Sequence, residues 1–218
     1  MSFTKSPQIV SSQTALHGNL KKVVDRYLNS EYQNSIPKYA RDAFKIADDF
    51  VRKRNASVIL DSGCGTGEST YHLARQYPDH TVIGIDKSAS RLERYAHEMC
   101  PNQLFLHADC ISFWQLATQS PWRLEQHYLL YPNPWPKPGH LQRRWHAHPV
   151  FPLMIKLGGT MVMRTNWDIY AREFSYALSV ILKRPVGFTT LQVNHSISAH
   201  EKKYLLSRHQ LYEVSAEL

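Results

Sequence analysis

The feature that most constrains this chain is a glycine-rich turn after a short apolar run. Residues 58–60 read Val-Ile-Leu, and residues 61–67 read Asp-Ser-Gly-Cys-Gly-Thr-Gly before a predicted helix over 68–77. Glycine tolerates positive φ and has no Cβ, so a ligand can lie directly against its backbone. A buried strand, a glycine turn and a helix together form the nucleoside-binding unit of open α/β sheets. The sequence therefore predicts an α/β fold with a nucleoside-containing ligand at this turn.

The acid that opens the turn narrows the choice of ligand. Asp61 is followed by Gly63, Gly65 and Gly67, a spacing that differs from the Gly-x-Gly-x-x-Gly of dinucleotide sites. The Gly-Lys-Ser/Thr ending of triphosphate sites is also missing from this turn. The carboxylate of Asp61 would repel a pyrophosphate but attract a cationic sulfonium amino acid. We therefore expect S-adenosylmethionine as the cofactor.

Two further acids follow predicted strands. Asp86 ends the apolar run 81–86, and Asp109 follows the run 103–108. Parallel strands end at one edge of the sheet, where such folds bind their ligands. We expect Asp86 to accept hydrogen bonds from ribose hydroxyls and Asp109 to face the adenine amino group. The alternative is that both acids are helix N-caps, because Ser88 and Ser112 follow them closely.

The remaining pattern alternates short apolar runs with helical stretches. Further extended segments are expected at 127–131, 160–165, 185–193 and 211–214, and helices at 37–54, 88–99 and 169–182. A loose segment is expected at 111–118 and a polar loop at 198–204. Such alternation implies a mostly parallel, twisted, seven-stranded sheet with helices on both faces, a Rossmann-like α/β fold. We expect this domain to cover residues 37–218. Residues 1–36 are expected to form a mobile or irregular arm with a brief helix at 20–28.

A proline-rich passage follows the fourth predicted strand. Residues 132–138 contain four prolines, which exclude a helix or an interior strand and predict a stiff loop at the carboxyl edge of the sheet. Cations and planar rings accompany it: Trp135, Lys137, His140, Arg143, Arg144 and Trp145. Such a mixture suits phosphates and unstacked bases. The alternative is that the prolines shape a tight return and Trp135 fills the core.

The charge balance favours a polyanionic partner. The formal net charge is +8 and the pI is about 9.4, which makes nucleic acid the first candidate. No metal site is expected, because the three cysteines lack metal-type spacing and the histidines near residue 146 have no cluster of acids or cysteines beside them. No apolar run is long enough to span a bilayer, and the N-terminus has no apolar signal region, so we expect a cytoplasmic protein.

These motifs resemble the bacterial tRNA (guanine-N7-)-methyltransferases, within the class I S-adenosylmethionine-dependent methyltransferases, over roughly residues 56–215. Residues 132–137, with the histidine and paired arginines that follow, look like the family's Pro-Asp-Pro-Trp-x-Lys, His and Arg-Arg signature. Thr165-Asn166 looks like its Thr-Asp, and Ser198-x-x-Glu201 like the Thr-x-x-Glu that grips the target guanine. The resemblance implies methylation of guanine N7 in tRNA.

Residue by residue, the resemblance implies three sets of roles. The cofactor would be bound by Asp61, Gly63, Gly65, Gly67, Asp86, Asp109 and Asn133. The RNA substrate would be bound by Lys137, His140, Arg143, Arg144, Asn166, Ser198 and Glu201. Asn133 would also occupy the catalytic position.

The chain departs from the family at two acids and in its N-terminal arm. Asn133 and Asn166 stand where aspartates are expected, and the arm lacks an arginine-rich motif. Neutral guanine has a lone pair and no proton at N7, so methyl transfer needs alignment and charge stabilisation but no general base. Glu201 or Asp168 could supply the missing charge. Alternatives are a non-catalytic RNA-binding homologue or a small-molecule methyltransferase, and both a monomer and a homodimer stay open.

Overall fold

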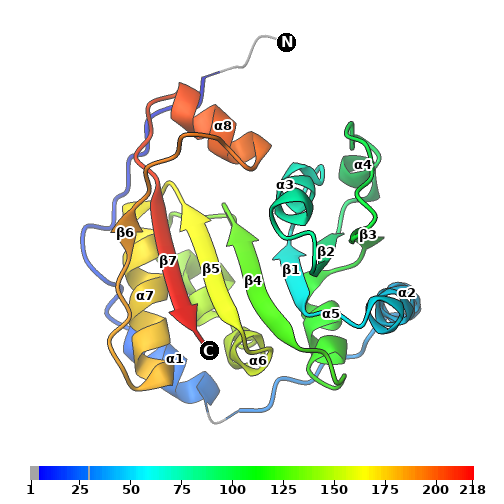
Figure 1. Ribbon diagram of the computed structural model, residues 1–218. Helices are drawn as coiled ribbons and strands as arrows, with labels where there is room; N and C mark the ends of the chain where they lie inside the picture. The colour runs from blue at the N-terminus through cyan, green and yellow to red at the C-terminus, as the bar shows by residue number, and fades with distance from the viewer. Residues whose placement is uncertain (1–4, 29) are drawn as a thin grey trace.

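A seven-stranded sheet forms the centre of the computed structural model, which describes residues 5–28 and 30–218. The strand order is β3-β2-β1-β4-β5-β7-β6 (Figure 1). The first five strands along the chain pair in parallel, whereas β7 pairs antiparallel with both β5 and β6. The predicted mostly parallel, seven-stranded α/β fold is therefore confirmed. The first four residues of the predicted arm lie outside the described residues.

The elements alternate along the chain as the apolar pattern predicts. The strands are β1 Val58–Ser62, β2 Thr81–Asp86, β3 Gln103–His107, β4 Leu124–Leu130, β5 Thr160–Thr165, β6 Thr189–Thr190 and β7 Tyr212–Glu217. The α-helices are α1 Leu20–Leu28, α2 Lys38–Arg54, α3 Glu68–Gln76, α4 Ala89–Leu92, α5 Cys110–Ala117, α6 Phe151–Lys156, α7 Asp168–Leu182 and α8 Ala199–Leu206. Two 3-10 helices, η1 Pro138–Arg143 and η2 Trp145–Ala147, lie between β4 and α6.

The two faces of the sheet carry cores of different size. Successive strand residues point to opposite faces, and in β1 the side chains of Val58 and Leu60 join a large core while that of Ile59 joins a small one. The large core contains residues of α1, α2, α5, α6 and α7, and the small core contains residues of α3. Burial on both faces explains why the central strands read as continuous apolar runs.

Four predicted segments differ from the structure. In the extended segment expected at 185–193, only Thr189–Thr190 forms a strand, β6. The helix expected at 88–99 is confined to α4, Ala89–Leu92. The segment expected to be loose at 111–118 is helix α5, because Asp109 caps it by accepting a 2.8 Å hydrogen bond from the Ser112 amide. The region interpreted as a polar loop after residue 198 is helix α8, capped by the Ser198 hydroxyl. In the last two cases a side-chain cap starts a helix whose apolar periodicity is weak.

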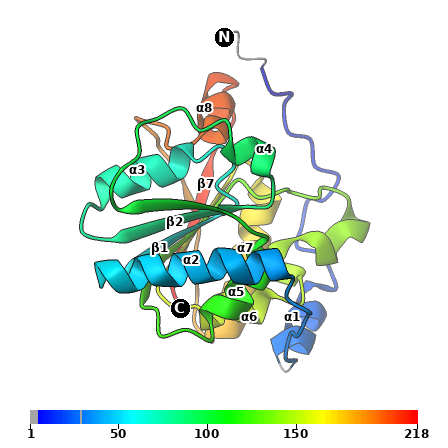
Figure 2. The same ribbon diagram turned by 90° about the vertical axis from the view of Figure 1, so that its right-hand side faces the viewer.

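The N-terminal arm packs along the body of the domain. Helix α1 matches the brief helix expected at 20–28 and contacts α6, α7 and η2. Before it, the Ser6 amide donates a 2.9 Å hydrogen bond to Ser207 Oγ, and the His17 amide donates one of 2.9 Å to Glu173 Oε1. Figure 2 shows this segment running along one side of the molecule, from the neighbourhood of α8 to α1. The described part of the arm is therefore tied to the domain at both ends.

Candidate functional site

The glycine turn leaves its backbone bare at the carboxyl edge of the sheet. Gly63, Gly65 and Gly67 have φ angles of 79°, 63° and 82°, which L side chains rarely adopt. A Cβ on Gly63 or Gly65 would meet no atom within 4 Å, whereas one on Gly67 would lie 2.6 Å from the Phe105 ring. The first two glycines therefore leave open space beside the turn, and the third allows close packing between α3 and β3.

Asp61 presents a buried carboxylate that is only half satisfied. Its side chain is fully buried, and Oδ2 accepts hydrogen bonds from Ser69 Oγ at 2.6 Å and Thr70 Oγ1 at 2.7 Å. Oδ1 has no hydrogen-bond partner within the described part of the chain. Burial raises the pKa of Asp61 to about 6, against the opposing effect of the two hydroxyls. A buried oxygen without a partner is costly, and a cationic amino group would satisfy it.

Asp86 lies beside the turn at the end of β2. Its Oδ2 accepts hydrogen bonds from the Gly65 amide at 3.0 Å and Arg91 Nη1 at 3.1 Å, and its Oδ1 accepts one of 2.8 Å from the Ser88 amide. The N-cap of α4 is Ser88, so Asp86 does not cap that helix. The carboxylate therefore links the end of β2 to the glycine turn.

Asp109 has the N-cap position that the alternative interpretation gave it. Besides capping α5, it accepts a 3.1 Å hydrogen bond from the Tyr39 hydroxyl of α2 through Oδ2. The cap fixes this carboxyl group beyond β3, at the same edge of the sheet as the glycine turn. Capping and ligand binding are compatible, because each carboxylate oxygen accepts more than one hydrogen bond.

The proline-rich loop holds Trp135 near the surface. Tyr131 and Trp135 have φ angles of 52° and 45°, and Asn133, which is exposed, accepts a 3.3 Å hydrogen bond from the Trp135 amide. The guanidinium carbon of Arg143 lies 4.7 Å from the Trp135 ring centroid, and the His140 ring meets that ring edge-on at 5.5 Å. Trp135 is half-buried and is not part of either core, so it does not fill the interior.

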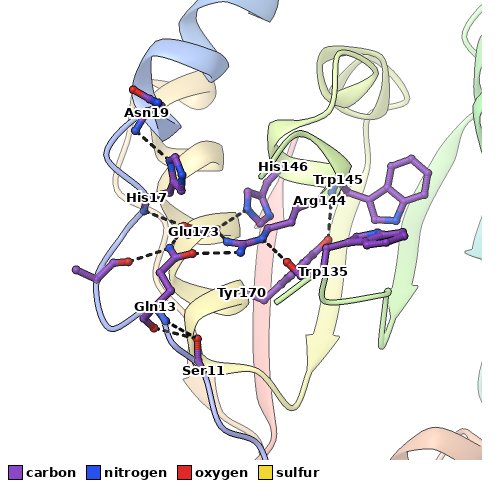
Figure 3. A network of polar contacts seen from close by, with 11 residues as sticks. Ser11, Gln13, His17, Asn19, Trp135, Arg144, Trp145, His146, Tyr170 and Glu173 are labelled. Carbon is purple, nitrogen blue, oxygen red and sulfur yellow. Dashed lines mark hydrogen bonds and ion pairs between the residues drawn. The ribbon is translucent and has the colours of Figure 1, made fainter. Parts of the chain in front are cut away.

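Two cations of the proline-rich passage face outward, but the second arginine of the pair does not. Lys137 and Arg143 are exposed. Arg144, which the sequence grouped with them, is only 1% exposed and forms an ion pair with the buried Glu173 of α7 (Figure 3). Arg144 therefore has no surface with which to contact a substrate, which departs from its predicted role.

The remaining predicted substrate residues lie at the same edge but are also buried. Glu201 accepts hydrogen bonds from the Tyr131 hydroxyl at 2.7 Å, from Arg164 Nη1 at 3.0 Å and from the Ile197 amide at 2.8 Å. The Ser198 hydroxyl accepts a 3.2 Å hydrogen bond from the Glu201 amide. Figure 1 shows α8, which carries Glu201, above the ends of β4 and β5. Arg164 also pairs with Glu213 Oε2 at 2.8 Å, so Glu201 shares this cation with a second carboxylate while backbone and side-chain donors occupy its oxygens.

Neither acid expected to replace the missing charges is unpaired. Asn166 is 8% exposed and its Nδ2 lies 3.0 Å from His209 Nδ1, so the end of β5 carries no carboxylate. Asp168 forms a 2.5 Å ion pair with Arg172, and Glu201 pairs with Arg164. The half of the site predicted to bind the cofactor therefore carries three carboxylates, whereas the half predicted to bind the substrate has no unpaired acid at positions 166, 168 and 201.

Several partners in this region were missed from the sequence. Arg164 lies within the apolar run of β5, and Glu173 lies among buried apolar positions of α7. A lone charge in such surroundings needs a partner of opposite sign, so the sequence could have indicated that a partner exists. It could not have indicated which residue is the partner, because Glu201 and Arg144 are far away along the chain.

Residues 5–28 and 30–218 include no group of three or more histidines, cysteines or acids placed to hold a metal ion. Within those same ranges, the helices are too short or too polar to cross a lipid bilayer.

Comparison with known proteins connects the chain to one family. A family model described as "Putative methyltransferase" matches residues 55–213. A protein named tRNA (guanine-N(7)-)-methyltransferase in Nitrosomonas europaea is 27% identical over an alignment that covers 67% of this chain and 69% of the relative. The protein of the same name in Nitrosococcus oceani is 31% identical, and the alignment covers 63% of this chain and 59% of the relative. The relative of that name in Thermus thermophilus is 31% identical over 70% of this chain and 50% of its own length. The aligned segments thus span between half and about 70% of these relatives.

Solved structures agree on the fold. "Structure of an Antibiotic Related Methyltransferase" has a TM-score of 0.56 at 15% identity, covering 87% of this chain and 97% of that one. The 16S rRNA methyltransferase KamB has a TM-score of 0.54 at 16% identity, covering 86% and 96%. At such identities the likeness establishes only the class I methyltransferase fold.

Proposed function

This chain belongs to the methyltransferase family whose model matches residues 55–213, and on that premise we propose that it transfers a methyl group from S-adenosylmethionine to guanine N7 in tRNA. The observation that carries the proposal is the meeting of two features at one edge of the sheet. One is the half-satisfied Asp61 beside an open glycine turn, and the other is the stiff loop that exposes Lys137 and Arg143. The names of the curated relatives support tRNA as the substrate.

The residues of the glycine turn fit the methyl donor. Asp61 Oδ1 would accept a hydrogen bond from the donor's amino group, Asp86 would bind the ribose hydroxyls and Asp109 the adenine amino group. The bare backbone at Gly63 and Gly65 leaves room for the ligand. Bound S-adenosylmethionine would supply an electrophilic methyl group on its sulfonium sulfur. The acids favour this cation over anionic nucleotides.

The loop after β4 would hold the RNA. Lys137 and Arg143 are exposed cations that can contact phosphates, which sets orientation and affinity without reading sequence. Trp135 and His140 offer ring faces on which a base can stack, and the exposed amide of Asn133 can hydrogen-bond the base edge. Since guanine N7 carries no proton, these residues need only align the base and tolerate the positive charge that develops on the purine.

Incubation with radiolabelled S-adenosylmethionine and unmodified tRNA transcripts tests the proposal. We expect label in the RNA, and strongly reduced label with Asp61→Asn or Lys137→Ala. A control variant, Asp79→Asn, changes an exposed acid just before β2, at the opposite edge of the sheet, and should transfer label normally. Cofactor binding without label in any tRNA would overturn the proposed activity.

A second candidate function follows from the missing carboxylates. Asn133 and Asn166 carry no charge, and Glu201 is buried against Arg164. A chain that binds RNA and cofactor but transfers no methyl group would have this arrangement. It would show salt-sensitive tRNA binding without turnover, and turnover with any tRNA would rule it out.

A further inference from the structure

A buried charged cluster lies behind the proline-rich loop, apart from the cofactor half of the site. Arg144 is 1% exposed, and Glu173 and His146 are fully buried. Burial of a charged pair is unfavourable unless its hydrogen bonds are complete. Figure 3 shows that these side chains converge on one point between η2, α7 and the N-terminal arm. The cluster therefore requires partners, and the arm provides some of them.

Arg144 joins three segments that are far apart in the sequence. Its Nε donates a 3.2 Å hydrogen bond to the Trp135 carbonyl in the loop. Its Nη1 pairs with Glu173 Oε2 on α7, and its Nη2 donates a 3.1 Å hydrogen bond to Gln13 Oε1 in the arm. One rigid guanidinium thus fixes the loop, the helix and the arm relative to one another.

Glu173 depends on the arm for half of its donors. Gln13 Nε2 donates to Oε1 at 2.5 Å and the His17 amide at 2.9 Å, while Arg144 and His146 reach Oε2. Burial alone would raise the pKa of Glu173, but the hydrogen bonds and charges around it lower the pKa to about 2. If the arm left, the Oε1 atom of a buried carboxylate would lose both of its donors.

Trp135 is the residue on which this cluster acts. A φ of 45° is unfavourable for a bulky side chain and persists only where the surroundings hold it. Asn133 holds its amide, Arg143 and His140 hold its ring, and Arg144 holds its carbonyl. Because Arg144 also binds Gln13, the conformation of the loop is linked to the docking of the arm.

The arm also forms one wall of a cleft at the end of β5. The cleft has a volume of about 420 Å³ and includes Gln8, Ser11 and Gln13 of the arm on one side and Asn166, Trp167 and His209 on the other. Asn166 is one of the residues proposed to bind the nucleotide. The arm therefore lies next to the substrate half of the site as well as behind its loop.

We propose that Gln13, Arg144 and Glu173 form a clamp that makes residues 11–17 of the arm part of the RNA-binding site. Docking of the arm fixes the Trp135 carbonyl through Arg144, and so sets the direction of Asn133, Lys137 and Arg143. Arg144 acts as a positioning residue, since it contacts the loop and never the substrate. The link to RNA rests on the proposed function, whereas the coupling between arm and loop does not.

Hydrogen exchange of the full chain measures the coupling without any ligand. In Gln13→Ala we expect faster amide exchange both in residues 11–17 and in residues 133–143, measured well below the melting temperature of the variant. The matched control is Gln8→Ala, which removes a 3.3 Å hydrogen bond from the arm to the Ser207 carbonyl but touches no member of the clamp. It should leave the exchange of residues 133–143 unchanged. Faster exchange in the arm alone would overturn the clamp.

Binding and kinetics separate the clamp from the proposed function. For Gln13→Ala and Arg144→Lys we expect the KM for tRNA to rise about fivefold, the effect of one lost hydrogen bond, while the Kd of S-adenosylhomocysteine stays the same. An unchanged KM for tRNA in both variants would overturn the role of the clamp in RNA binding. If the loop loosens as expected but wild-type protein neither binds nor methylates tRNA, the coupling stands and the proposed function fails.

Discussion

The backbone amide of Gly65 donates a 3.0 Å hydrogen bond to Oδ2 of Asp86, which ties the glycine turn after β1 to the acid at the end of β2. The Asp61 carboxylate lies nearby at the end of β1, where burial and, to a smaller extent, the negative charge of Asp86 raise its pKa. Two acids and a bare backbone are thus assembled by two adjacent parallel strands.

Replacing Asp61 should weaken binding of the methyl donor. Its buried Oδ1 lacks a partner within the described residues, so a cationic ligand gains a charge-assisted hydrogen bond there. We expect Asp61→Asn to raise the Kd of S-adenosylhomocysteine by about 10- to 100-fold, because hydrogen bonds to charged groups contribute about 1.5–3 kcal/mol. Titration calorimetry measures this effect. An unchanged Kd would show that Oδ1 does not meet the ligand.

Binding of the same ligand should depend on pH in a defined direction. Burial raises the pKa of Asp61 to about 6, so the carboxyl group is ionised above pH 6 and protonated below it. Only the ionised form attracts a cation, and affinity should therefore fall about tenfold per pH unit as pH drops below 6. Titrations between pH 5 and pH 8 measure the profile. The affinity of Asp61→Asn should not fall below pH 6 in this way. An equal fall in that variant would show that another group causes the pH dependence.

Restoring a carboxylate in the loop should speed methyl transfer. A carboxylate about 4 Å from the developing charge stabilises it by about 4 kcal/mol at an effective dielectric of about 20. Such a stabilisation would raise the rate of methyl transfer by at most roughly a thousandfold. Asn133 is exposed, so we expect Asn133→Asp to raise kcat about tenfold. Aspartate can keep the hydrogen bond to the Trp135 amide, whereas Asn133→Ala cannot and should lower kcat. An equal or lower rate for Asn133→Asp would contradict the charge argument.

Removing the exposed cations of the loop should weaken RNA binding without changing its selectivity. Lys137→Ala and Arg143→Ala should each reduce the slope of log Kd against log salt by about one, as expected for one lost phosphate contact. Arg143→Ala should reduce the affinity for RNA more than Lys137→Ala, because Arg143 also stacks on Trp135. Lys156→Ala, which changes an exposed lysine of α6, is the control. If Lys137→Ala and Arg143→Ala keep the salt slope of the wild-type protein, as the control should, the RNA binds another surface.

Much of the fold could be predicted from local patterns. The strands at 81–86 and 160–165 match β2 and β5 residue for residue, since runs buried on both faces have an unambiguous apolar signature. Helices α5 and α8 were missed because each depends on a capping side chain, Asp109 or Ser198, more than on periodicity. Both helices are stabilised by capping hydrogen bonds, which the spacing of apolar residues does not reveal.

The placement of the acids beside the glycine turn could be predicted, but the exposure of the cations after β4 could be predicted only in part. Asp61 and Asp86 lie at the carboxyl ends of two adjacent strands, so parallel topology alone brings them together. The burial of Arg144 could not be seen in an Arg-Arg pair, because consecutive residues after a 3-10 turn can face opposite ways and the partner Glu173 is 29 residues away. Charge pairing across such distances is a property of the folded chain.

Nucleoside analysis of the reaction product tests the central claim most directly. Unmodified tRNA is incubated with wild-type protein and S-adenosylmethionine, digested to nucleosides and examined by mass spectrometry, with Asp61→Asn in parallel. We predict 7-methylguanosine with the wild-type protein and at least tenfold less with the variant. A digest without 7-methylguanosine, from wild-type protein that binds both S-adenosylhomocysteine and tRNA, would contradict the account.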